Sequence, residues 1–477
     1  MPQTADPALL LAPLHALSHR LAAGSLTAAA LTEACLSHIA RADPKLHAFV
    51  EVYADEARAM AEAADIVRAR GLPVGPLHGI PLALKDLCEL EGRRTTGGSL
   101  HWAERVSTLT CTVARRLLDA GMIVVGKTHM VEFAFGGWGT NARMGTPWNP
   151  WDLTTHRVPG GSSSGSGVAV AAGMVPAALG SDTGGSVRIP ASVCGLVGLK
   201  TTAGRVSNHG ILPLSPTLDT IGPLVRAVED AALLYDVLHG PDGADPATWP
   251  HAPALAMPRL REPVRGLRVG LPGSPHLDGL DADVARHFQA AVEALGGLGV
   301  HVETIPLPGS FFSYLEQTGT IISAEAYDLL GDVVEDEAAP LDPHVRARIL
   351  GGRAFNRDAQ GAHGYLSALR ERRQAQAALA PIFDQVDAIL TPTTPIPAPP
   401  LSDVDESRLP LSRFTRAINF LGLCALAVPM GVTEAGLPTS LQIIGRPFCE
   451  PLLLRLGWAY EQARGPLGAQ PDVTAMG

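Results

Sequence analysis

Two short loops rich in glycine and serine carry the residues of this sequence that could do chemistry. One loop is Pro159-Gly-Gly-Ser-Ser-Ser-Gly-Ser-Gly167, and the other is Gly180-Ser-Asp-Thr-Gly-Gly-Ser-Val-Arg188. Glycines let backbone amides approach a ligand closely, so that several N–H groups can point at one spot. Such a spot suits an oxyanion, which is either a phosphate or the tetrahedral intermediate of acyl transfer.

Phosphate is the first alternative, and the two loops do not match the motifs that bind it. A P-loop places a lysine directly after its last glycine, and neither loop has one. The dinucleotide-binding pattern GxGxxG is absent as well. The tetrahedral oxyanion is therefore the better fit.

A second alternative is the nucleophile elbow of α/β-hydrolases, because Gly161-Ser-Ser-Ser-Gly165 satisfies GxSxG with Ser163 as the nucleophile. An elbow follows a strand, however, and residues 154–159 do not have the pattern of one. Its triad also needs a histidine well downstream. The last histidine is His363, which leaves 114 residues without one. The base is therefore sought among other residue types.

Lys85 is the candidate base. It lies in Gly79-Ile-Pro-Leu-Ala-Leu-Lys-Asp-Leu87, an apolar run that predicts a strand leading into the interior. Burial disfavours the ammonium form and can lower the pKa of a lysine by about 3–5 units. A neutral amine near pH 7 could take a proton from a serine. The alternative is a structural lysine that forms a salt bridge with the adjacent Asp86.

Together these segments resemble the amidase signature family over a long stretch. The resemblance runs from Gly79 to Pro223 and resumes at Phe420-Leu-Gly-Leu-Cys-Ala-Leu-Ala-Val-Pro429 and Leu437-Pro-Thr-Ser-Leu-Gln-Ile-Ile-Gly-Arg-Pro447. One Gly/Ser loop alone would be a weak signal. Three spaced segments in the right order are specific.

The resemblance implies a catalytic triad. The lysine of the family pattern falls on Lys85, the first serine of its GGSS loop on Ser162, and the serine that closes its SDTGGS-like loop on Ser186. The two serines are 24 positions apart, as in the family. By this resemblance Ser186 attacks the amide carbonyl, while Ser162, after a cis Gly161–Ser162 bond, shuttles the proton to and from Lys85. The implied oxyanion hole consists of the backbone amides of Thr183, Gly184, Gly185 and Ser186.

The family resemblance and the alternation of apolar runs with turns along the chain both predict an α/β fold. Short apolar runs alternate with Gly-, Ser- and Thr-rich turns, which predicts layers around a largely buried sheet. We expect one domain over residues 1–477, with a central mixed β-sheet covered by helices on both faces. Its expected parts are a helical N-terminal part (1–70), the signature core (79–224), a surface loop (240–263) and a helical substrate-pocket region (310–383).

Further site residues are expected from the same resemblance. Asp182 and Arg188 match positions interpreted as a structural ion pair that holds the second loop. Phe135 and Trp138, with Gly161, are expected near the acyl pocket, and Trp138 is expected to form an exposed wall. A cluster in the substrate-pocket region hints at apolar walls, namely Phe311, Phe312 and Tyr314.

Metal and cofactor chemistry is not expected. His129 and Glu132 could be metal ligands, but two residues without a third nearby are more often one face of a helix. The triad chemistry that the resemblance implies uses neither a metal nor an organic cofactor.

The charge and the apolar composition of the chain argue against nucleic acid and membrane as binding partners. The net charge is −10 and the basic residues are scattered, whereas a nucleic-acid-binding protein would be expected to show a basic footprint. No stretch offers the roughly 20 apolar residues of a membrane span, and no signal peptide is recognised. Six cysteines without a CxxC pair indicate a reducing compartment. We expect a cytoplasmic monomer or homodimer that acts on a small-molecule amide, without nucleic acid or membrane.

The predicted function is that of a stand-alone amidase for small apolar or aryl amides, with esters and carbamates (a urethanase-like activity) also permitted. The alternative within the family is the glutaminase subunit of the tRNA-dependent amidotransferase. That subunit holds the ammonium group of glutamine with an acidic residue a few positions before the segment matching Ile418-Asn419. Here Ser412-Arg-Phe-Thr-Arg-Ala417 stands there, with two arginines and no carboxylate. This departure favours an independent amidase.

Overall fold

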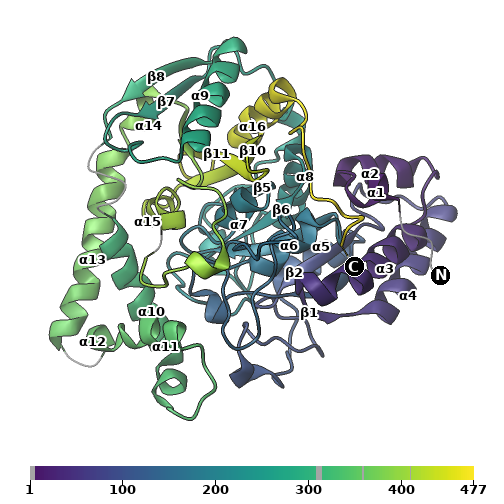
Figure 1. Cartoon of the computed structure of the whole chain (residues 1–477), viewed down its shortest axis with the longest axis horizontal. Coiled ribbons are helices and arrows are strands. Elements are labelled where there is room, and N and C mark those ends of the chain that lie inside the picture. The colour runs from purple at the N-terminus through teal and green to yellow at the C-terminus, as the bar shows by residue number, and fades with distance from the viewer. Residues whose placement is uncertain (1–5, 308–313, 357–358, 409, 477) are drawn as a thin grey trace.

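A single eleven-stranded mixed sheet forms the frame of the chain, and helices flank it (Figure 1). The computed structural model describes residues 6–307, 314–356, 359–408 and 410–476. The strands, in sheet order, are β1 Phe49–Val52, β3 Ile123–Thr128, β2 Pro81–Lys85, β4 Ala177–Asp182, β6 Thr220–Val225, β5 Val197–Lys200, β10 Cys424–Val432, β11 Pro438–Gly445, β9 Ala388–Pro392, β7 Arg268–Pro272 and β8 His301–Ile305. The mixed α/β architecture expected from the sequence is confirmed.

The helices that precede β7 are α1 Pro7–Leu10, α2 Leu14–Ala22, α3 Ala28–Leu46, α4 Ala54–Ala69, α5 Thr112–Asp119, α6 Ser164–Ala171, α7 Arg188–Val193 and α8 Val228–Leu238. The later helices are α9 Ala282–Gly297, α10 Leu315–Glu335, α11 Pro343–Leu350, α12 Arg353–Asn356, α13 Ala359–Leu379, α14 Ile382–Gln385, α15 Arg416–Phe420 and α16 Glu450–Arg464. None of the described helices is long and apolar enough to cross a membrane.

The two strands that matter most for the site, β2 and β4, lie in the interior of the sheet. β2 pairs in parallel with β3 on one side and with β4 on the other. All of its residues are buried, which explains its continuous apolar run, because a parallel strand covered on both faces does not alternate. β2 ends at Lys85 and β4 ends at Asp182, so the parallel pair delivers both residues to the same edge of the sheet.

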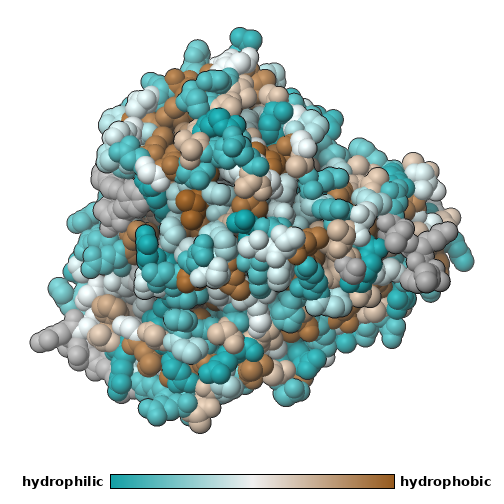
Figure 2. Space-filling model, viewed as in Figure 1, coloured by the Kyte–Doolittle hydropathy of each residue, from teal (hydrophilic) through white to brown (hydrophobic). Residues whose placement is uncertain are grey.

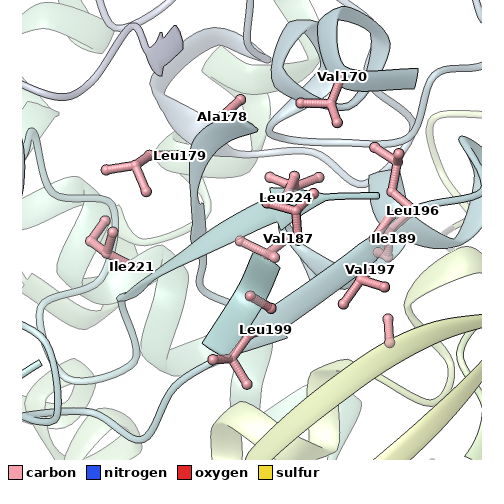
Figure 3. Close-up of a cluster of buried hydrophobic side chains, with 14 of the residues drawn as sticks. Val170, Ala178, Leu179, Val187, Ile189, Leu196, Val197, Leu199, Ile221 and Leu224 are labelled. Atoms are coloured by element: carbon pink, nitrogen blue, oxygen red, sulfur yellow. The ribbon is translucent and has the colours of Figure 1, made fainter. Parts of the chain in front are cut away.

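The core beneath the site is aliphatic. Figure 3 shows Val170 of α6, Leu179 of β4, Ile189 of α7 and Leu224 of β6 in one buried cluster. Gly165 lets α6 pack against this sheet, because a Cβ there would be 2.2 Å from the Ala48 carbonyl oxygen. Gly165 in the first loop therefore serves helix packing. The outer surface mixes polar and small apolar patches (Figure 2).

Two segments differ from their expected character. The N-terminal part is helical but also contains β1, which pairs antiparallel with β3 at the edge of the sheet. The segment 240–263 is not purely a surface loop, since it contains short 3-10 helices at Pro246–Thr248 and Met257–Arg259 and buries Leu260. The strands β7 and β8 pair in parallel and are joined through α9, which makes a β-α-β unit.

Candidate active site

Lys85 is fully buried at the end of β2, and two serine hydroxyls meet its amine. Its Nζ donates to Ser162 Oγ over 2.7 Å and to Ser181 Oγ over 2.8 Å. The neighbouring Asp86 forms no salt bridge with Lys85; it lies 3.6 Å from Lys127 Nζ and accepts from Thr96. The structural alternative of a Lys85–Asp86 ion pair is therefore excluded.

Burial sets the protonation of Lys85. Loss of solvent lowers the pKa of its ammonium group to about 7, although the carboxylates of Asp219 and Asp182 act in the opposite direction. An amine with this pKa is partly neutral at physiological pH. It can then accept a proton and return it, which a fully charged surface lysine cannot do.

Ser162 lies between the lysine and the second loop. It follows a cis Gly161–Ser162 peptide bond, as the resemblance implied. The Gly161 amide donates to the Gly137 carbonyl over 2.8 Å, and the Ser162 carbonyl accepts from the Val131 amide over 3.1 Å. These contacts hold the fully buried Ser162 side chain toward the lysine.

Ser186 precedes α7 and lines a small cavity of about 40 Å³. In the described part of the chain its hydroxyl has no hydrogen-bond partner, and no hydrogen bond joins it to Ser162 Oγ. The backbone does connect the two loops, since the Ser163 amide donates to the Ser186 carbonyl over 3.3 Å. Ser186 is thus a nearly buried serine whose hydroxyl is available to a molecule in the cavity.

The second loop offers three free amides rather than the four expected. The Gly185 amide donates to Asp182 Oδ1 over 2.8 Å, so the carboxylate already satisfies it. The amides of Thr183, Gly184 and Ser186 find no acceptor among the described residues, and all three residues line the cavity. Gly185 was expected to contribute a fourth amide to the oxyanion hole. Its N–H is not available, because the Asp182 side chain of the same loop accepts from it.

Asp182 and Arg188 form the expected ion pair, and both are fully buried. Arg188 Nε donates to Asp182 Oδ2 over 3.0 Å, and Nη2 donates to Oδ1 over 2.9 Å. Asn419 joins the pair from both sides, because it donates to Asp182 and accepts from Arg188. Arg188 holds the pKa of Asp182 well below its usual range even though burial acts in the opposite direction. The pair braces the loop that carries Ser186.

The walls of the cavity are mostly apolar. Phe135 is on the wall as expected, together with Ile189, Leu214 and Ile322. Trp138 is not: it is 4% exposed, and its indole donates to the Arg408 carbonyl over 3.0 Å. The exposed wall expected at Trp138 is therefore wrong, because the chain around residue 408 covers the ring. Gly161 does not line the cavity, although its amide donates to Gly137, which does.

The expected aromatic cluster in the substrate-pocket region is only partly described. Phe311 and Phe312 lie outside the described residues. Tyr314 stacks on Phe420 of α15, with ring centroids 5.1 Å apart. The region nevertheless reaches the cavity through Ile322 of α10 and Arg348 of α11.

Several site residues were not expected from the sequence. Ser181 is the second partner of Lys85, and its signal was the serine directly before Asp182 at the end of β4. Arg348, Ser412 and Arg416 line the cavity from α11 and the segment that ends in α15. In the sequence, the two arginines of that last segment indicated only the absence of a carboxylate.

His129 and Glu132 do not face the cavity. The His129 ring contacts that of His47, with centroids 4.2 Å apart, and Glu132 accepts from the Ser99 hydroxyl and the Asp342 amide. Within the described ranges, no group of three or more His, Cys, Asp or Glu side chains is arranged to hold a metal ion. Four larger cavities among the described residues, of about 100 to 550 Å³, contain none of Lys85, Ser162 and Ser186.

Comparison with known proteins places this site in a family. The family model described as Amidase matches residues 30–454. The chain belongs to the amidase signature family. The matched residues include all eleven strands of the sheet and the residues of the site. Membership of this family identifies the chain as an amidohydrolase.

Its relatives have different roles. The chain is 39% identical over 467 residues to a glutamyl-tRNA(Gln) amidotransferase subunit of Chloroflexus aurantiacus, covering 93% of this chain and 94% of the relative. It is 38% identical over 465 residues to a 2-amino-5-chloromuconic acid deaminase of Comamonas testosteroni, covering 95% and 97%. The peptide amidase structure from Stenotrophomonas maltophilia superposes with a TM-score of 0.83 at 33% identity, covering 97% and 98%.

Proposed function

We propose that this chain is a stand-alone amidase that hydrolyses the C–N bond of small amides through an acyl-enzyme on Ser186. One observation carries the proposal: a buried lysine whose pKa is near 7 donates to Ser162, in the loop next to a serine whose hydroxyl is open to the cavity.

The first half of the reaction is acylation. Neutral Lys85 accepts the proton of Ser162, which takes the proton of Ser186 as Ser186 Oγ attacks the carbonyl carbon. The free amides of Thr183, Gly184 and Ser186 stabilise the oxyanion, and one such donor is typically worth about 3–4 kcal/mol. The C–N bond then breaks. Protonated Lys85 returns a proton through Ser162 to the departing nitrogen, which leaves as the amine.

The second half is deacylation by water. A water molecule gives one proton along the same path to Lys85 while its oxygen attacks the ester carbonyl of the acyl-enzyme. The bond between the acyl carbon and Ser186 Oγ then breaks, and the proton on Lys85 returns to Ser186. The products are a carboxylic acid and the free enzyme.

The cavity supports a small substrate with an apolar or aryl part. Phe135, Ile189, Leu214 and Ile322 give it aliphatic and aromatic walls. Esters and carbamates present the same carbonyl to the same nucleophile, so a urethanase-like activity belongs to the proposal. We place the enzyme in the cytoplasm as a monomer or homodimer that needs no nucleic acid or membrane.

The second candidate is the glutaminase subunit of a tRNA-dependent amidotransferase, which the 39% identity to such a protein favours. A glutamine site needs an acid for the ammonium group of glutamine. The segment expected to supply it lines the cavity with Ser412 and Arg416 instead, and none of the described lining residues is acidic. This chemistry supports the stand-alone interpretation.

The test uses the purified chain alone against anilides, aliphatic amides, esters, carbamates and glutamine, with Ser186→Ala as the control. We expect amine release from a substrate other than glutamine, with loss of release in the variant. Activity on glutamine alone, or only after partner proteins are added, would favour the amidotransferase role.

A further inference from the structure

We propose that the substrate carries a carboxylate and that the guanidinium of Arg416 binds it at the wall of the cavity beside Ser186. This inference rests on the proposed amidase function and narrows its substrate class to short amides that are also acids. It makes Arg416 a specificity-determining residue and assigns it no part in proton transfer.

Arg416 lies next to the reacting atoms. It is the first residue of α15 and lines the same cavity as Ser186 and Gly184. Its stem passes over the loop with the free amides, since a Cβ built on Gly184 would be 3.7 Å from both Cγ and Nε of Arg416. A ligand whose carbonyl oxygen rests on those amides therefore has this side chain at its edge.

The guanidinium of Arg416 lacks a protein partner. It forms no hydrogen bond or ion pair with any residue that the structure describes, and its Nε is shielded from solvent with nothing to receive its proton. Buried guanidinium groups are normally paired, because an unpaired one loses its hydration without compensation. The missing partner is an acceptor that comes with the ligand.

The other arginine of the cavity is already occupied. Arg348 donates to the Phe135 carbonyl over 2.8 Å and forms an ion pair with Glu406. Arg416 is half-buried beside it without such a carboxylate. Arg348 is therefore a structural arginine, whereas Arg416 is available to bind a ligand.

The field in the cavity favours an anion. Two arginines and no acidic side chain are among its described lining residues. Burial, followed by the charge of Arg348, lowers the pKa of Arg416 to about 10, so the group is still cationic at neutral pH. A carboxylate would offset both effects, and its two oxygens match the planar fork of a guanidinium.

The size of the cavity limits the distance between the two functional groups. Arg416 and Ser186 line the same small cavity, of about 40 Å³, so a short chain is expected to join the scissile carbonyl to the carboxylate. The chemical class that fits is the monoamide of a short dicarboxylic acid, either aliphatic or unsaturated. The apolar walls then contact the carbon chain between the two groups.

The experiment compares the monoamides of succinic and glutaric acid with neutral amides of the same chain length. We expect a higher kcat/KM for the acids in the unaltered enzyme. Arg416→Met should lower kcat/KM for the acids by about 10- to 100-fold, the usual range for a lost charged hydrogen bond, and lower it much less for the neutral amides. Arg416→Lys should recover part of the loss. Arg413→Met, at a neighbouring arginine outside the cavity lining, is the matched control.

A binding measurement keeps the inference separate from catalysis. Calorimetric titration of the unaltered chain with glutarate should show binding that Arg416→Met removes and Arg413→Met retains, whether or not any amide is turned over. Equal losses on acidic and neutral amides would overturn the inference and make Arg416 a stabiliser of the oxyanion. No preference for acids and no glutarate binding would overturn it as well. Absence of all amide hydrolysis, with glutarate still bound through Arg416, would instead reject the proposed amidase function.

Discussion

Lys85 Nζ and Ser162 Oγ lie 2.7 Å apart in a part of the protein closed to solvent. Burial lowers the pKa of Lys85 to about 7, so the amine can both accept and return a proton near neutral pH. The acid–base chemistry of the proposed mechanism depends on this pair. The first two predictions therefore concern the protonation of Lys85.

The rate should rise with pH. Only the neutral form of Lys85 accepts a proton, and with a pKa of about 7 that form is minor below pH 6 and dominant above pH 8. We expect kcat/KM on a neutral amide to increase about tenfold per pH unit below pH 7 and to level off above it. The measurement covers pH 5.5 to 9, with folding checked by circular dichroism. A steady fall over this range in a folded protein would contradict Lys85 as the base.

Ser181→Ala should move the same pH profile. The Ser181 hydroxyl accepts from the ammonium form of Lys85 over 2.8 Å, and its removal makes that charged form less favourable. The midpoint of the profile should therefore shift to lower pH, and the plateau of kcat should fall by up to about tenfold because the amine loses one of its two anchors. Ser166→Ala, at another buried serine that does not contact Lys85, should leave the midpoint where it is.

Phe135 and Trp138 should differ in their effects on substrate binding. Phe135→Ala removes part of the cavity wall, so KM for amides with an apolar or aryl part should rise about tenfold or more. Trp138→Phe removes the hydrogen bond to the Arg408 carbonyl and part of a buried ring, at a cost of about 1–3 kcal/mol in stability, and should leave KM unchanged. Steady-state kinetics on an anilide series checks both. A shift of substrate preference in the Trp138 variant alone would reverse our assignment of the wall.

Arg188→Met should destabilise the fold severely. It leaves the Asp182 carboxylate buried without its cation, which typically costs about 3–5 kcal/mol. Urea unfolding measures the loss. The control is Arg259→Met, since Arg259 pairs with Glu262 on the surface, where the ion pair is screened by solvent, and should leave the free energy of unfolding almost unchanged. A similarly small change for Arg188→Met would mean that the pair does not hold the loop of Ser186.

The sequence predicted the parts of the site that depend on local pattern. The apolar run before Lys85 indicated β2, and the glycine-rich loops indicated free amides near Ser186. The motif spacing placed Ser162 in the other loop, and the structure brings it to hydrogen-bonding distance of Lys85. These features are specified within a few residues of one another or by a family pattern.

The remaining features depend on contacts between distant segments, which a pattern does not contain. Trp138 is buried by the chain around Arg408, and Arg416 has no carboxylate among the described residues that line the cavity with it. Ser181 reaches Lys85 only because β4 pairs with β2 in parallel. The hydrogen bond of the Gly185 amide is local but was still not predicted. It forms because the path of the loop brings the Asp182 side chain to the Gly185 N–H.

The most direct test of the central claim is to identify the residue that is acylated. The unaltered chain is mixed with a slowly deacylating aryl ester, quenched in acid, and analysed by peptide mass spectrometry. We predict that one acyl group is added on the peptide containing Ser186, that Ser186→Ala carries none, and that Lys85→Met accumulates it far more slowly. An acyl group on Ser162 or Ser163, or turnover by Ser186→Ala at the unaltered rate, would contradict the account.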